Sequence, residues 1–201
     1  MNNDNQYHEI AQGAIKKLVE LNASNKWQEN GNKPCAMFKT EIDGRVASKG
    51  IDKVKFSIEK VISFLEKEES LKLINPMLLE IKSLYVVEDK FRVNYMQYKG
   101  IWPVDNRDFV NVSAKEWQGN TFIIATAACN FPHPEVKSVV RAEVYVGGYI
   151  IEKIDENTTQ VTYISDADLK GSIPGMIKNT LSAKQGEIAS KIQEAMVKGG
   201  Y

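Results

Sequence analysis

The chain begins and ends with helical patterns of apolar residues. Residues 6–22 and 174–197 each place apolar side chains three or four positions apart, the spacing that lines one face of a helix. Pro174 fits the first turn of the closing helix, where its missing N–H is not needed. The apolar positions are Ile10, Ala14, Leu18 and Leu21 in the first helix, and Ile177, Leu181, Ile188, Ile192 and Met196 in the last. Each pattern predicts a long amphipathic helix.

Between these helices the pattern changes to alternation, with many Val, Ile, Tyr, Phe and Thr residues separated by Gly or polar turns. A further helical stripe follows Ser57, and residues 70–79 form a short helix or turn. The predicted strands are 36–42, 51–56, 80–88, 91–99, 108–117, 121–129, 138–154 and 159–169. This order predicts an α+β fold, in which one curved antiparallel sheet holds the long C-terminal helix against its concave face.

Composition narrows the possible partners. The chain of 201 residues is long enough for one domain, which we expect to be monomeric and to span 1–201. Lys plus Arg and Asp plus Glu number 26 each, so no excess of positive charge points to nucleic acid or to purely electrostatic adhesion to a membrane. The start of the chain lacks the pattern of a secretory signal, and Cys35 and Cys129 are expected to be reduced thiols. We therefore expect a cytoplasmic protein.

Three segments in a fixed order carry a family resemblance. They are WPVDNRDFV at 102–110, VVRAEVYVGGYIIEKI at 139–154 and DADLKGSIPGMIKNTL at 166–181, preceded by NPMLLEIKSLYVVED at 75–89. Together they resemble the START domain, the lipid-transfer module related to the steroidogenic acute regulatory protein. The resemblance covers essentially the whole chain. It implies a helix-grip fold with an internal tunnel for one lipid, which is moved between membranes without covalent chemistry and without a cofactor or metal.

The resemblance also implies where the lipid and the membrane would lie. The C-terminal helix is the lid, and the loop at 98–108 is the opposite lip. The residues expected in the lipid cavity are Asn94, Tyr95, Met96, Asn111, Ser113, Arg141, Tyr145, Tyr163, Thr180, Leu181 and Lys184. Those expected at the gate, in transient contact with a membrane surface, are Ile101, Trp102, Ile173, Met176 and Ile177.

Several of these positions have two interpretations. Arg141 either lies on a solvated face of the sheet or enters the cavity, where it could meet a phosphate or carboxylate. Lys184 either extends to solvent or contacts a head group. Trp102 suits a membrane interface, but it could instead cover a small core beneath its loop. Arg107 is expected to form a structural ion pair that fixes its loop, in preference to a ligand contact. Asp166 and Asp168 are both plausible partners, and Asp168 is the one we predict.

The small side chains Ala125, Ala127 and Ala128 either leave room for a ligand or allow close approach of a helix. One departure from the family matters for the ligand. Several START proteins carry a buried pair of an acidic residue and an arginine at the positions of Asn94 and Ser113, and neither residue is charged here. This weakens the transfer of sterol recognition through that pair. The sequence at 102–109 resembles the phosphatidylcholine-transfer branch of the family more closely, which slightly favours a phospholipid as the ligand.

Two other function classes remain open from the sequence. The wider superfamily includes cyclases and hydrolases, but His8 and His133 have no metal-ligand spacing and no nucleophile or phosphate-loop motif occurs. A module that holds its lipid as a sensor, for interaction with a protein, is the other alternative. We therefore predict a non-enzymatic lipid carrier.

Overall fold

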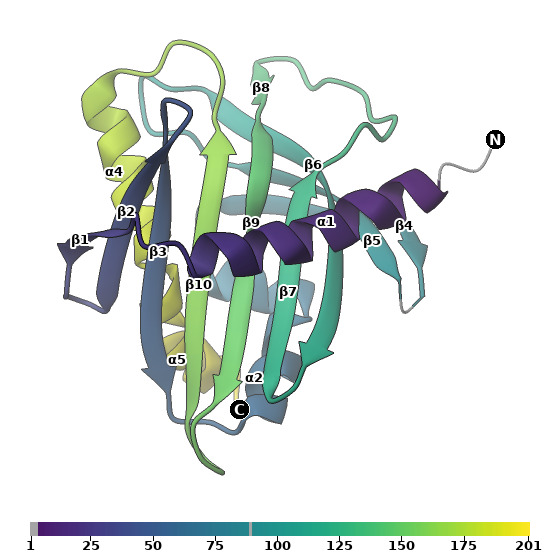
Figure 1. Cartoon of the computed structure of the whole chain (residues 1–201). Coiled ribbons are helices and arrows are strands. Elements are labelled where there is room, and N and C mark those ends of the chain that lie inside the picture. Colours follow the sequence, from purple (N-terminus) through teal and green to yellow (C-terminus); the bar gives the residue numbers. More distant parts are fainter. Residues whose placement is uncertain (1–3, 89) are drawn as a thin grey trace.

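The computed structural model describes residues 4–88 and 90–201, and these form one strongly curved sheet with helices on both faces (Figure 1). Neighbouring strands are antiparallel in the order β1-β2-β3-β10-β9-β7-β6-β5-β4, and the short β8 runs parallel to the start of β6. The strands are β1 (Gln28–Gly31), β2 (Ala36–Ile42), β3 (Arg45–Val54), β4 (Leu78–Val87), β5 (Phe91–Tyr98), β6 (Asn106–Gln118), β7 (Thr121–Ala128), β8 (Val139–Arg141), β9 (Glu143–Lys153) and β10 (Thr159–Asp168).

The helices occupy the two faces unequally. In Figure 1, α1 crosses the front of the sheet, while α2, α4 and α5 lie behind it. The helices are α1 (Asp4–Asn22), α2 (Ile58–Leu65), α3 (Glu68–Ile74), α4 (Gly175–Gly186) and α5 (Ile188–Lys198). The predicted α+β fold, with C-terminal helical chain against the sheet, is confirmed.

Each face of the sheet has its own apolar core. One core joins α1 to side chains of β5, β6, β7 and β9, and the other joins α2, α3 and α5 to β3, β7, β9 and β10. Ala125 and Ala127 belong to the first core together with Ala11 and Ala14 of α1, and Ala125 is also among the residues that line the cavity described below. The helix that packs on this face of β7 is α1 and not the C-terminal one.

Two predicted elements are divided. The closing helix is interrupted at Glu187, next to Gly186, whose backbone carbonyl lies so near Gly50 of β3 that a Cβ there would be 1.9 Å away. Glycine is a poor helix former and permits this approach. The predicted strand 138–154 is split at Ala142, whose N–H donates to the Asp108 carbonyl over 2.9 Å. The first strands also differ from the prediction. β1 was not predicted, and β3 begins at residue 45, whereas the predicted strand began at residue 51.

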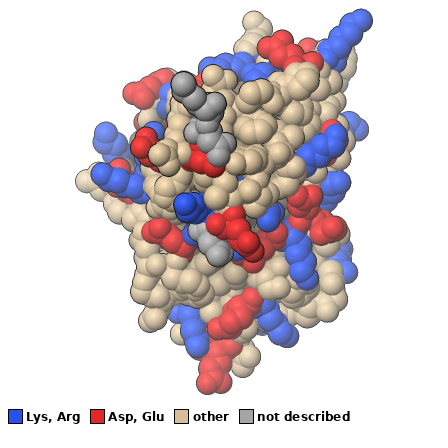
Figure 2. Space-filling view, turned by 90° about the vertical axis from the view of Figure 1, so that its right-hand side faces the viewer, with Lys and Arg blue, Asp and Glu red and all other residues tan. Residues whose placement is uncertain are grey.

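Basic and acidic side chains are interspersed on the face of the molecule drawn in Figure 2. On the face turned toward the viewer in Figure 2, Lys and Arg side chains alternate with Asp and Glu side chains. This agrees with the equal numbers of acidic and basic residues in the sequence. Among the described residues, no helix is both long and apolar enough to cross a membrane.

Candidate ligand-binding cavity

A cavity of about 1230 Å³ lies between the sheet and the helices behind it. Its sheet wall comes mainly from β5, β6, β9 and β10, and its helical wall includes Leu71 and Ile74 of α3, Leu181 and Gln185 of α4, and Ile188 of α5. Pockets for small molecules usually measure about 300–1,000 Å³, so this cavity suits a larger ligand. Aliphatic and aromatic side chains supply much of the lining, which favours an apolar ligand body.

Alternation along β5 decides which predicted residues face this cavity. Asn94 and Met96 line it, together with Tyr98 at the end of the strand. Tyr95 points to the opposite face, where it is 2% exposed and belongs to the core under α1. The prediction that Tyr95 lines the cavity is therefore wrong, because successive side chains of a strand lie on opposite faces and Asn94, Tyr95 and Met96 cannot share one.

Tyr95 is instead part of an aromatic contact on the outer face. Its ring stacks on that of His133, with the centroids 4.2 Å apart. Burial, with the negative charge of Asp108 nearby, raises the pKa of Tyr95 to about 12. The loop that carries His133 is thereby fixed against the sheet on the side away from the cavity.

Uncharged polar side chains from neighbouring strands meet inside the cavity wall. Asn111 and Ser113 of β6 line it beside Asn94 of β5, and the register pairs Asn94 directly with Asn111. The Asn94 amide Nδ2 donates to the Ser113 Oγ over 3.5 Å. The two positions predicted to replace the charged pair of other START proteins are thus adjacent and hydrogen-bonded.

Three tyrosines add hydroxyl groups to the same wall. Tyr98, Tyr149 and Tyr163 line the cavity, and the rings of Tyr149 and Tyr163 are 5.0 Å apart. The Tyr163 hydroxyl donates to the Gln185 Oε1 over 3.1 Å, which joins β10 to α4. Burial raises the pKa of all three phenols, in the case of Tyr163 to about 12. These phenols are therefore neutral at physiological pH.

Arg141 does not enter the cavity. Its Nε and Nη2 donate to the two carboxylate oxygens of Asp108 over 2.7 and 3.1 Å, and Nη2 also donates to the Pro134 carbonyl over 3.3 Å. The hydrogen bonds to Asp108 hold the pKa of Arg141 above its ordinary value. The prediction of a cavity role is therefore wrong: β8 pairs with β6 so that Arg141 meets Asp108, whose side chain points away from the cavity.

Tyr145 is also outside the main cavity, on the face of β9 near α1. Its ring lies under the guanidinium of Arg45, with 3.8 Å between the guanidinium carbon and the ring centroid. Arg45 in turn makes a bidentate pair with Asp166, at 3.0 Å for each contact. Tyr145 therefore supports an ion pair between β3 and β10, which corrects its predicted position in the cavity.

The predicted ion pair between Arg107 and Asp168 is not formed among the described residues. Arg107 donates to the carbonyls of Asp105, Leu169 and Lys170 over 2.5, 3.1 and 3.2 Å, and burial lowers its pKa. Arg107 therefore still ties the 98–108 loop to the chain after β10, but through backbone oxygens.

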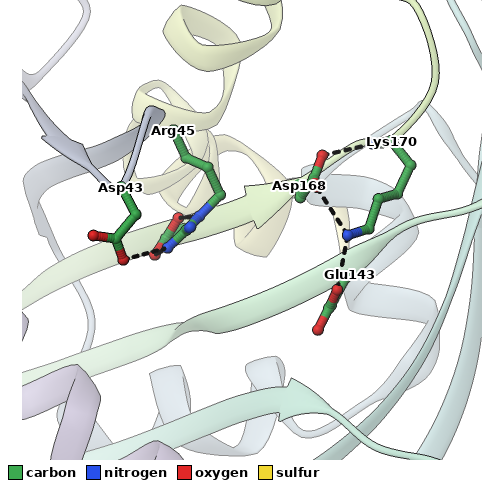
Figure 3. Close-up of polar contacts among 6 residues, drawn as sticks. Asp43, Arg45, Glu143, Asp168 and Lys170 are labelled. Carbon is green, nitrogen blue, oxygen red and sulfur yellow. Dashed lines mark hydrogen bonds and ion pairs between the residues drawn. The ribbon is translucent and has the colours of Figure 1, made fainter.

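Asp168 pairs instead with Lys170, as Figure 3 shows. The Lys170 Nζ lies 2.9 Å from Asp168 and 3.0 Å from Glu143, while Arg45 bridges Asp166 and Asp43 (Figure 3). Each cluster pairs one basic residue with two carboxylates, and four of the residues, Asp43, Arg45, Asp168 and Lys170, are among those that line the cavity.

Two of the five predicted gate residues are among those that line the cavity. Ile101 and Ile173 line it, and Ile173 is only 8% exposed. Trp102 is 90% exposed on the neighbouring loop, so it covers no core. Ile177 is half-buried at the start of α4, and the side chain of Met176 lies outside the described part of the structure.

Other residues of α4 divide between the cavity and solvent. Leu181 lines the cavity as predicted, whereas Thr180 and Lys184 are exposed and are not among the described residues that line it. This agrees with the interpretation that Lys184 extends to solvent, and it corrects the two predicted cavity positions.

Sequence reasoning missed part of the wall. Ile124, Thr126, Gln185 and the glycines of β9 line the cavity, as do α3 residues. Gly148 has a φ of 144°, and a Cβ there would lie 2.0 Å from the Ile124 carbonyl, so a larger residue cannot fit. The Gly147-Gly148 pair within a strand was a signal for this close approach. The α3 residues gave no such signal. Among the described residues, no group of His, Cys, Asp and Glu could hold a metal ion.

Comparison with known proteins identifies the family. The sequence model of the START domain matches residues 52–198, most of the chain, and the chain therefore belongs to the START domain family. Human steroidogenic acute regulatory protein, mitochondrial, is 28% identical over 184 residues, which are 84% of this chain and 61% of that protein. Human START domain-containing protein 10 is 30% identical over 91 residues, 45% of this chain and 31% of that protein. The chain thus spans less than two thirds of the length of either relative.

The fold agrees with this assignment. Human StAR-related lipid transfer protein 5 superposes with a TM-score of 0.89, over 98% of this chain and 99% of that one, at 13% sequence identity. At this identity the likeness establishes the helix-grip fold alone.

Proposed function

We propose that the chain encloses one lipid in the cavity and transfers it between membranes without changing it chemically. The single observation that carries this proposal is the cavity of about 1230 Å³, which is lined by many apolar side chains together with polar and charged ones, in a member of the START domain family. Human StAR-related lipid transfer protein 5, which has the same fold, is named for lipid transfer.

The rim of the cavity supports a membrane-facing gate. The exposed indole of Trp102 adjoins Ile101, which lines the cavity as Ile173 does, and Ile177 is half-buried at the start of α4. An indole beside apolar residues partitions favourably into a membrane interface. The lid would then open where the protein touches the bilayer, so that the lipid tail avoids water.

Arg141 gives no support to the predicted preference for a phospholipid. One of its two interpretations was a contact with a phosphate or carboxylate in the cavity, but Arg141 is engaged by Asp108 on the other side of the sheet. That preference rests on the sequence of residues 102–109.

The test combines identification of the ligand with measurement of transfer. Native mass spectrometry of the chain purified from a eukaryotic lysate should find one bound lipid per chain, and the chain should accelerate movement of that lipid between vesicles. A consistently empty chain that accelerates no exchange would refute the proposal. Stable retention without exchange would indicate a sensor, and conversion of the captured molecule would indicate an enzyme.

A matched pair of variants tests the gate. Ile177→Asp, and likewise Met176→Asp, should slow transfer and leave the circular dichroism spectrum unchanged, because a charge is placed where the lid meets lipid. Val197→Asp is the control, since Val197 is an exposed apolar residue of the neighbouring α5 and is 61% exposed. Equal transfer rates for Ile177→Asp and Val197→Asp would contradict the assignment of the gate.

A further inference from the structure

Asn111 has an unusual environment within the cavity wall. Its side chain is only 4% exposed and lines the cavity, and its Oδ1 has no hydrogen-bond partner among the described residues. Buried polar atoms in native proteins are almost always hydrogen-bonded, because an unpaired one loses its interaction with water without replacement. The side chain therefore needs a partner that the chain itself does not supply.

The neighbouring polar groups are already paired with one another. The Ser83 hydroxyl donates to Asn94 Oδ1 over 3.2 Å, the Asn94 Nδ2 donates to Ser113 Oγ, and the Ser113 hydroxyl donates to the Arg92 carbonyl over 3.3 Å. This sequence of hydrogen bonds ends at a backbone oxygen and leaves no hydroxyl proton for Asn111. Asn94 is the register partner of Asn111, and both side chains belong to the residues that line the cavity.

We infer that Asn111 hydrogen-bonds a free hydroxyl of the bound lipid, and that the ligand is a neutral lipid with such a group. A hydroxyl both donates and accepts, so it satisfies the Asn111 amide in either orientation of its oxygen and nitrogen. Sterols, diacylglycerols and ceramides share this chemistry. Phosphatidylcholine has no hydrogen-bond donor and would leave Oδ1 unpaired. The inference rests on the proposed function, because it requires that the cavity hold a lipid.

The experiment compares lipids with and without the hydroxyl. All vesicles are made of dioleoylphosphatidylcholine, and one lipid is labelled in each arm of the experiment. The labelled lipid is cholesterol, dioleoylglycerol or a ceramide, or in one arm the dioleoylphosphatidylcholine itself. The labelled lipid bound to the chain is measured after the vesicles are removed. Cholest-5-ene, which is cholesterol without its hydroxyl, and the dioleoyl ester of 1,2-propanediol serve as hydroxyl-free analogues. The wild type should bind at least one hydroxyl lipid about tenfold more tightly than its analogue, since the unpaired amide penalises the analogue.

Asn111→Leu should abolish that preference, because leucine has a similar size and needs no partner. The control is His8→Phe, which removes another buried unpaired atom, His8 Nδ1, at a position outside the cavity lining and should keep the preference. In the lipid-free state Asn111→Leu should unfold at the same temperature as the wild type or higher, because an apolar residue replaces an unsatisfied polar one.

The possible outcomes separate the inference from the proposed function. Binding and transfer of phosphatidylcholine alone would overturn the hydroxyl inference and leave lipid transfer intact. Absence of any bound lipid would overturn both. Equal binding of cholesterol and cholest-5-ene, and of the two dioleoyl lipids, by the wild type would overturn the inference without requiring any variant. A hydroxyl preference that persists in Asn111→Leu would overturn the assignment to Asn111.

Discussion

Replacing Gly50 with alanine is expected to lower the free energy of unfolding and to displace α4. A Cβ at Gly50 would lie 1.9 Å from the Gly186 carbonyl oxygen, whereas ordinary contacts begin at 3.4 Å. The strand and the helix must therefore separate by about 1.5 Å locally, since both atoms in the clash are close to rigid backbone. Overpacking of this kind costs about 1–3 kcal/mol.

The consequence can be measured by thermal unfolding. For a chain of this length, a loss of about 1–3 kcal/mol corresponds to a fall in Tm of about 2–12 °C. Because α4 supplies Leu181 and Gln185 to the cavity wall, the same displacement should accelerate release of a bound lipid from the chain to acceptor vesicles. Circular dichroism melting and a vesicle release assay would record the two effects.

Gly13 supplies the matched control for the same substitution. It lies within α1, and nothing lies within 4 Å of a Cβ placed there. Gly13→Ala should raise the stability by about 0.5–1 kcal/mol, because alanine loses less backbone entropy in a helix. A Gly50→Ala chain with unchanged or higher Tm would refute the close approach of α4 to β3 as a steric constraint.

Three further predictions concern the loop, the cavity and the outer face. Trp102→Ala should weaken flotation of the chain with vesicles and leave Tm unchanged, because the indole is 90% exposed. Trp117→Ala, at another exposed tryptophan, is the control, and equal vesicle binding by the two variants would contradict a membrane role of Trp102. Tyr163 has a pKa raised from 10.0 to about 12, so the folded state binds more protons between these pH values and stability falls as pH rises. The unfolding free energy of Tyr163→Phe, measured by denaturant titration, should therefore fall less than that of the wild type over this pH range. The same dependence of unfolding free energy on pH in both proteins would contradict this. Asp108→Ala should lower the unfolding free energy by about 3 kcal/mol, since the paired Arg141 keeps a half-buried charge, whereas a loss below about 1 kcal/mol would show the pair to be dispensable.

The successes of sequence reasoning at the cavity came from local periodicity. Asn111 and Ser113 are two positions apart in a strand, so their shared face followed directly from alternation, and both line the cavity. The prediction for Tyr95 failed because Asn94, Tyr95 and Met96 were all assigned to the cavity, although consecutive residues of a strand alternate between its two faces. The α3 part of the wall, which includes Leu71, could not be predicted, because nothing in a short apolar segment indicates which face of a distant sheet it will cover.

The partners of charged residues could not be predicted for a related reason. Arg141 lies in a strand as predicted, whereas Arg107 lies in β6 and not in the predicted loop at 98–108. Arg141 pairs with Asp108, and Arg107 with backbone carbonyls. The choice depends on the pairing of β8 with the start of β6, and that pairing joins residues more than thirty positions apart. Electrostatic pairing requires contact within a few ångströms, which only the folded chain defines.

The sequence by itself determined the types of element, the α+β class and the family, because apolar periodicity and ordered motifs are local properties of the chain. Only the tertiary structure decided that α1 covers one face of the sheet, that Gly186 meets Gly50 and that Asn111, whose Oδ1 is unpaired, lies in the wall of a cavity. These features come from strands and helices distant in sequence that pack together. An empty space and an unsatisfied oxygen are properties of that packing, and no single segment encodes either.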